Sequence, residues 1–166
     1  AEGLAAQLEQ TQRALEQAAR MSAPQALREK LKVIQAAWSE AVSAQTHALE
    51  LTQAMRAQDP RRPAAAVWTE RELAELFAAS AVQGQAESKV GSLRQSIAAL
   101  GQAPGEAPLA AAAAAQALAG ASLRERRLVA ALTSQRRALE LLRQGLKELD
   151  EELRREEQTA ESMSRP

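Results

Sequence analysis

Among the side chains that most often do catalytic chemistry, this chain of 166 residues has one histidine, 21 carboxylates and no cysteine. A single imidazole excludes every site that needs two histidines. The absence of thiols excludes cysteine nucleophiles, disulfides and cysteine-ligated zinc. The one histidine, His47, falls off the apolar stripe expected for its segment, which favours a solvent-exposed side chain over a general base.

The 21 acidic residues are spread over expected helix faces beside Arg and Lys. Glu151 follows Lys147 by four residues, for example, which is the spacing of an ion pair on a helix surface. The sequence contains no glycine-rich phosphate loop, no GxSxG, no HExxH and no EF-hand loop. We therefore predict no catalytic residue, no metal site and no cofactor, and we expect that the protein is not an enzyme.

The overall charge points away from nucleic acid as a partner. The 21 basic residues balance the 21 acidic ones, whereas nucleic-acid-binding proteins carry a basic footprint. Locally the charge is uneven, with seven basic and two acidic residues in 122–147, and six acidic and two basic residues in 148–157. This gradient suits an acidic partner helix or antiparallel pairing of two copies, but it is more typical of a solvated coiled-coil face.

The composition predicts an all-helical fold. Forty alanines and 22 leucines make up most of the hydrophobic 46%, and aromatic residues are only 2%. This mixture is typical of coiled coils and long helices, whereas Val, Ile, Thr and aromatic residues are too sparse to cover a sheet. No apolar run approaches the roughly 18 residues of a membrane span, so we expect no transmembrane segment. The chain starts without an initiator methionine or a signal-peptide pattern, and we expect a fragment of a larger protein.

Apolar spacing predicts two helices in the first part of the chain. Residues 1–21 carry a heptad seam, which predicts a coiled-coil helix, and its members are Leu4, Leu8, Thr11, Leu15 and Ala18. Pro24 behind Ser22 predicts the start of a second helix over about 24–58. Trp38 lies on the stripe of that helix, and we expect it to be a core anchor rather than a ligand platform. Two prolines in residues 59–63 predict a turn.

A capping box at Thr69–Glu72 predicts the start of a third helix, which runs to about Leu100. Its apolar stripe includes Phe77. Gly84 and Gly91 are expected where another backbone approaches closely.

Residues 102–121, rich in Ala, Gly and Pro, are expected to form a connector, either an exposed helical extension or a poorly ordered segment. A second capping box, Ser122–Glu125, predicts a fresh helix start. The helix over 122–160 has the most regular seam in the chain, and its members are Leu128, Leu132, Gln135, Leu139, Leu142, Leu146, Leu149 and Leu153.

We therefore predict an all-α fold, namely an antiparallel helical bundle or coiled coil of three long helices plus an N-terminal helix. The expected units are a coiled-coil helix (1–21), a helical hairpin (22–101), a connector (102–121), a leucine-heptad helix (122–160) and a tail (161–166). A parallel dimer of the whole chain is the competing arrangement, because a leucine seam does not reveal whether its partner lies in the same chain.

A chain that places its few large apolar residues on long seams favours protein–protein association as its function. We expect partner contacts on the seven seam leucines of the last helix and on Arg136 and Arg137. Trp68, just before the Thr69 cap, is either a hydrophobic staple or an anchor that faces a partner.

Several short segments also carry a family resemblance. In chain order they are Met21-Ser22, Leu27-Arg28 with Lys30 and Ile34, His47-Ala48-Leu49, Trp68-Thr69 with Leu73 and Glu75, Leu132-Thr133-Ser134 with Arg136, Leu139-Glu140 and Leu142, and Leu153-Arg154-Arg155-Glu156 with Gln158-Thr159-Ala160. In this order they resemble the C-terminal coiled-coil region of the disrupted-in-schizophrenia scaffold protein family. This sequence departs from that region in its longer stretch between His47 and Leu132 and in having no cysteine.

The resemblance implies a non-enzymatic scaffold or adaptor that self-associates and binds other coiled-coil proteins, among them dynein-regulatory, centrosomal and signalling partners. It implies an intracellular, cytoplasmic location, at the centrosome or cytoskeleton, and a role in neurodevelopment. The alanine- and glutamine-rich sequence also resembles rod bundles of talin and vinculin type. The alternative prediction is therefore a bundle that associates with cytoskeletal filaments or a membrane through the basic surface of Arg124–Lys147.

Overall fold

The computed structural model describes residues 2–20, 23–60, 67–101 and 104–164, and every regular element in these ranges is an α-helix. The helices are α1 (Glu2–Arg20), α2 (Ala23–Gln58), α3 (Glu70–Ala98), α4 (Glu106–Arg124) and α5 (Leu128–Ser164). The predicted all-helical fold class is confirmed. Within the described ranges, none of the helices is long and apolar enough to cross a membrane.

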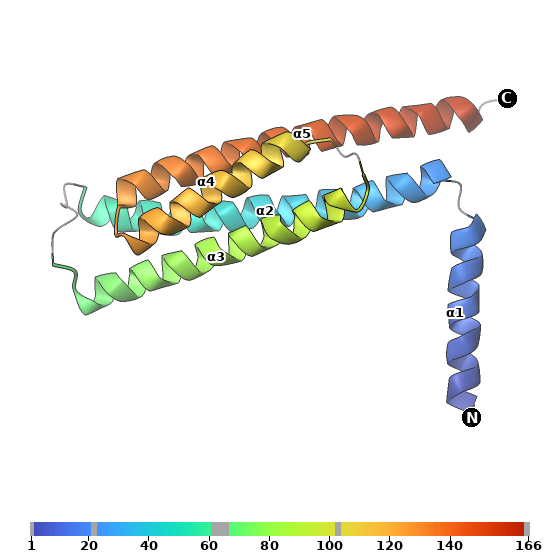
Figure 1. Cartoon of the computed structure of the whole chain (residues 1–166), viewed down its shortest axis with the longest axis horizontal. Coiled ribbons are helices and arrows are strands. Elements are labelled where there is room, and N and C mark those ends of the chain that lie inside the picture. Colours follow the sequence, from blue (N-terminus) through green and yellow to red (C-terminus); the bar gives the residue numbers. More distant parts are fainter. Residues whose placement is uncertain (1, 21–22, 61–66, 102–103, 165–166) are drawn as a thin grey trace.

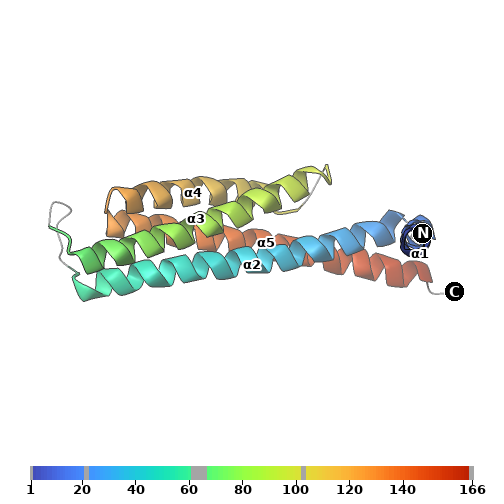
Figure 2. The ribbon, with the colours of Figure 1, turned by 90° about the horizontal axis from the view of Figure 1, so that it is seen from below.

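Four of the helices, α2 to α5, pack together as a bundle (Figure 1). α2 and α4 each lie beside both α3 and α5, so the four helices form a closed ring of neighbours around a shared core. The chain reverses its direction between each of these helices and the next (Figure 1), and the view from below shows them along one long axis (Figure 2). α1 extends away from the end of this bundle (Figure 1).

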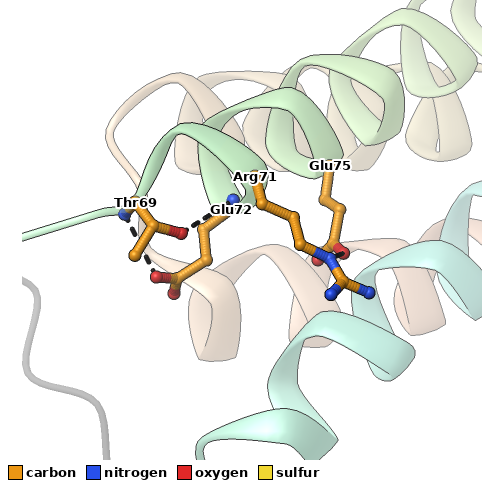
Figure 3. Close-up of polar contacts among 4 residues, drawn as sticks. All are labelled: Thr69, Arg71, Glu72 and Glu75. Carbon is orange, nitrogen blue, oxygen red and sulfur yellow. Dashed lines mark hydrogen bonds and ion pairs between the residues drawn. The ribbon is translucent and has the colours of Figure 1, made fainter.

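The start of α3 is set by the predicted capping box, which is confirmed. Thr69 Oγ1 accepts a hydrogen bond from the Glu72 backbone N–H, and the Thr69 N–H donates to Glu72 Oε1, both at 3.1 Å (Figure 3). Arg71 and Glu75 add an ion pair of 3.4 Å on the next turn (Figure 3). The two hydrogen bonds of the capping box satisfy backbone donors that a helix start leaves free.

Residues 106–124 correct the prediction of a connector. They form α4, which packs against α3 and α5, so the bundle has four packed helices and not three. The buried face of α4 repeats at steps of three and four, and it includes Leu109, Ala112, Gln116, Ala119 and Leu123. Alanine has the highest helix propensity of all residues, and its small side chain is buried without needing much space between neighbours.

The second capping box, Ser122–Glu125, does not start a helix, so that prediction is wrong. Its residues belong to the end of α4 and to the turn that follows, and the Glu125 N–H already donates to the Ala121 carbonyl at 3.0 Å. The Glu125 N–H is therefore not free to donate to the Ser122 hydroxyl, as a capping box would require. The helix break falls at Arg126, whose φ of 62° is left-handed, and α5 begins at Leu128.

The core consists of apolar clusters arranged along the bundle. One cluster surrounds Trp38 and draws residues from all four packed helices, among them Ile34, Val90, Leu109 and Leu142. A second gathers at the opposite end of α2, and a third, smaller one joins α2 to α5. We predict Phe77 on the buried stripe of α3. The prediction is wrong, because the Phe77 side chain is 78% exposed.

Candidate functional site

The predicted partner surface on α5 lies inside the bundle. Six of the seven seam leucines are buried and the seventh is half-buried against the same core: Leu128, Leu132, Leu139, Leu142, Leu149 and Leu153 are buried, and Leu146 is half-buried. Leu139 packs in a cluster with Leu49 of α2. The seam therefore finds its partners in its own chain, and it presents no open leucine face to another molecule.

Trp68 likewise belongs to the core. Its side chain is buried in a cluster with Met55 and Leu123, so it anchors the segment before α3 onto the bundle and does not face a partner. Arg136 and Arg137 are exposed on α5, where Arg137 Nη1 lies 3.5 Å from Glu140 Oε2. Of the predicted partner residues, the two arginines are thus the ones fully at the surface.

Trp38 is fully buried, which confirms the prediction of a core anchor. Its Nε1–H donates a hydrogen bond of 2.8 Å to the Leu142 carbonyl of α5. Gly145 leaves room for the ring, because a Cβ at that position would overlap Trp38 Cζ2. Gly105, which has a φ of 82° at the start of α4, covers the same ring, and a Cβ there would lie 2.8 Å from Cη2. One side chain thus joins α2, α5 and the start of α4.

The prediction that another backbone approaches Gly84 and Gly91 closely is wrong. A Cβ added at either glycine meets no atom within 4 Å, and both positions are exposed on α3. The two glycines with the closest neighbours, Gly105 and Gly145, lie instead around Trp38.

Four glutamines, one from each packed helix, meet in the interior of the bundle, and each is at most 1% exposed. Gln45 and Gln83 exchange two hydrogen bonds of 2.9 and 3.2 Å. Gln116 Nε2 donates to Gln45 Oε1 at 3.0 Å, and Gln135 Nε2 donates to Gln83 Oε1 at 3.2 Å. We call these residues the glutamine layer. The Gln116 and Gln135 side-chain oxygens accept no hydrogen bond, but sliding one helix by a turn would also separate the bonded amides, so the layer favours one register of the four helices.

The glutamine layer could have been found from the sequence. Gln135 interrupts the leucine seam of the last helix, and each of the other three glutamines fills a gap in an apolar stripe. Amides are neither acids, bases nor nucleophiles at neutral pH, and these four are buried and bonded to one another, so we assign the layer a structural role.

Titratable side chains occur on every described helix. His47 is exposed on α2, as expected. Burial raises the pKa of the Glu87 carboxyl on α3, and the positive charge of Arg124 on α4 lowers it to a smaller extent. In the described part of the chain, no three His, Asp or Glu side chains lie close enough together to hold a metal ion.

An open apolar groove of about 440 Å³ runs between α2 and the end of α3. It is lined mainly by aliphatic side chains, and its lining consists of Glu29, Lys30, Val33, Ile34, Ala37, Ser96, Ala99 and Leu100. Val33, one of the lining residues, is largely exposed. The groove offers contact area for an apolar side chain or helix, with few groups that could react.

α1 carries an exposed leucine face outside the bundle. Leu4, Leu8 and Leu15 are 64%, 63% and 66% exposed, and no other described helix packs extensively against them. Thr11 lies on the same seam, and its hydroxyl donates to the Gln7 carbonyl at 2.9 Å. Ala18, the last residue of the predicted seam, has a side chain outside the described set. α1 is therefore the strongest candidate for a binding surface.

Comparison of the chain with protein-family models, with characterised proteins and with solved structures finds no match. The inference of function therefore depends on the geometry of the chain itself.

Proposed function

We propose that the chain is a non-enzymatic scaffold or adaptor module that mediates protein–protein association, in which α2 to α5 form an antiparallel, coiled-coil-like bundle and α1 is the binding arm. The observation that carries this proposal is the contrast between the two leucine seams. The seam of α5 is buried within the chain, whereas the leucines of α1 are 63–66% exposed.

Burial of the exposed leucines of α1 would favour the binding of a partner helix. Full burial of a leucine side chain contributes about 1.5 to 3 kcal/mol, so the three leucines of α1 are a substantial source of binding free energy. In proteins most helical stability comes from packing of an amphipathic face, and α1, a helix of 19 residues, makes no extensive contact with another described helix. A partner helix placed on this seam would stabilise α1 and bury its leucines together.

The bundle supports this role as a stable unit that follows α1 in the same chain. Trp38 and the glutamine layer fix the positions of α2 to α5 relative to one another. A stable bundle joined to an exposed amphipathic helix is an arrangement suited to an adaptor.

Other coiled-coil proteins and further copies of the chain are the proposed partners. The resemblance to the disrupted-in-schizophrenia family extends the proposal to dynein-regulatory and centrosomal partners, and to a cytoplasmic location at the centrosome or cytoskeleton.

The proposal is tested by affinity capture from cells with three tagged proteins: the wild type, Leu8→Glu and Leu118→Glu. Leu118 on α4 is the matched control, because it is also a leucine that is 63% exposed. We expect a set of proteins that is captured by the wild type and by Leu118→Glu but is lost with Leu8→Glu. Equal circular dichroism spectra would show that the folds match. The same captured set with all three proteins would remove the proposal, and so would no capture above background by a chain that is also monomeric in solution.

A second candidate function is association with filaments or acidic membranes. The observation in its favour is that every basic residue of the 124–147 stretch is exposed, namely Arg124, Arg126, Arg127, Arg136, Arg137, Arg143 and Lys147. We expect cosedimentation with actin filaments or acidic vesicles to disappear after charge reversal at Arg126, Arg127, Arg136 and Arg137. Binding that survives the reversal, or no binding by the wild type, would exclude this candidate.

A further inference from the structure

We propose that α1 pairs in parallel with α1 of a second copy of this chain, so that the protein forms a dimer through its N-terminal helix. This inference rests on the proposed function and names one partner for the same surface.

The leucine seam defines the heptad register of α1. Leu8 and Leu15 take the a positions, and Leu4 and Thr11 take the d positions. Thr11 fits an interface because its hydroxyl is already bonded to the Gln7 carbonyl of its own helix. Burial against a second helix therefore leaves no orphan polar group at Thr11, and its methyl group faces the partner.

The residues beside the seam favour a second, parallel copy. Gln7 takes a g position, and Gln12 takes the e position of the following heptad. In a parallel two-stranded coiled coil these two positions face each other across the interface. Each amide has a donor and an acceptor, so Gln7 of one copy and Gln12 of the other form a complementary pair, which the two-fold axis repeats. In an antiparallel pair, g faces g and e faces e, and Gln7 does not meet Gln12.

The charges of α1 do not oppose pairing of identical helices. Glu9 and Arg13 take the b and f positions on the outer face, away from the seam, and the remaining described flanking position, Ala5, is uncharged. No like charges therefore meet across the interface. A partner helix of strong charge would gain nothing from these neutral flanks, whereas a second copy matches them.

The placement of α1 leaves its seam accessible. α1 extends away from the end of the bundle (Figure 1), and the turned view shows it end-on beside the ends of α2 and α5 (Figure 2). A second α1 can lie along it without entering the space of the four packed helices.

Sedimentation velocity of the full chain over a range of concentrations tests the pairing. We expect the wild-type mass to rise from the 17.8 kDa of one copy toward that of two copies. Leu8→Glu should remain at one copy at concentrations where the wild type is half dimeric. Leu118→Glu should behave like the wild type, because its substituted leucine is equally exposed but lies on the bundle.

The orientation is tested by cross-linking, which is clean because the chain contains no cysteine. Leu4→Cys should form a covalent dimer on oxidation, since a parallel pair brings the two copies of residue 4 together. Arg13→Cys is the control on the outer face and should remain monomeric. In an antiparallel pair, residue 4 faces the opposite end of α1 at roughly 20 Å, and Leu4→Cys would not cross-link.

A wild type that stays at one copy at every concentration would overturn the inference, whether α1 is free or folds onto the groove between α2 and α3. An assembly of three or four copies, or failure of Leu4→Cys to cross-link, would overturn the parallel pair. A monomeric chain that still captures other proteins through α1 would retain the proposed function and lose self-pairing. A chain that neither pairs with itself nor captures other proteins through α1 would overturn both the inference and the proposed function.

Discussion

Replacing Gly145 with alanine tests the contact between α5 and the ring of Trp38. The added Cβ would overlap Trp38 Cζ2 and lie 2.9 Å from Cη2, closer than real carbon atoms approach. The ring is fully buried, and the Gly105 carbonyl oxygen lies 3.4 Å from the same Cβ position. The substitution must therefore push the indole away from α5.

The expected magnitude combines three effects. Overpacking a core costs about 1 to 3 kcal/mol. Displacing the ring breaks the 2.8 Å hydrogen bond to Leu142, and a buried donor without a partner costs about 1 to 3 kcal/mol. Alanine gains about 1 kcal/mol over glycine in helix propensity. We therefore expect Gly145→Ala to lower the free energy of unfolding by about 1 to 5 kcal/mol.

Urea unfolding followed by the helical circular dichroism signal measures this change. Gly84→Ala and Gly91→Ala are matched controls, because no atom lies within 4 Å of a Cβ added to either helical glycine. Each control should raise the free energy of unfolding by about 1 kcal/mol. In a Trp38→Leu variant, Gly145→Ala should lower the free energy of unfolding by less, because the ring that the added Cβ meets is absent. If Gly145→Ala stabilises the protein as the controls do, the indole does not occupy the space above Gly145 and the reasoning fails.

Three further predictions concern other parts of the bundle. Leu139→Ala should lower the free energy of unfolding by about 2 to 5 kcal/mol in urea, as for a buried leucine, and a change below about 0.5 kcal/mol would show that its seam is exposed. Gln45→Ala removes the acceptor of the Gln83 and Gln116 amides, so it should cost about 2 kcal/mol or more, and a neutral result would contradict the hydrogen-bonded layer. Burial raises the pKa of Glu87, so its protonated form is favoured on folding; that stability is present below the ordinary carboxyl pKa and is lost as pH rises through the raised value. Glu87→Gln should therefore stabilise the protein above this window and not below it in urea titrations, and an effect independent of pH would contradict the assignment.

The sequence predicts best where large side chains or side-chain caps decide the structure. The Thr69–Glu72 box and the burial of Trp38 follow from local chemistry and from apolar periodicity. Periodicity also identified the buried face of α5, but it could not reveal that α5 packs against α2 and α4 of the same chain.

Alanine and glutamine carry less information, because both occur on either face of a helix. The 3-4 repeat of Leu109, Ala112, Gln116, Ala119 and Leu123 could have shown that α4 is packed, but a search for leucine alone passes over it. The prediction from the box at Ser122–Glu125 failed because the same four-residue pattern also occurs at the end of a helix.

The alanine-rich face of α4 sets the order in which the bundle opens. Apart from Leu109 and Leu123, the buried apolar residues of α4 are alanines and one proline, and a buried methyl group contributes only about 0.8 kcal/mol. α2 and α5 are held by larger side chains along greater lengths. In hydrogen exchange, the amides of α4 should therefore lose protection before those of α2 and α5, as a separate unit of local unfolding. We therefore expect partial unfolding to begin at α4, the helix between α3 and α5 in the chain.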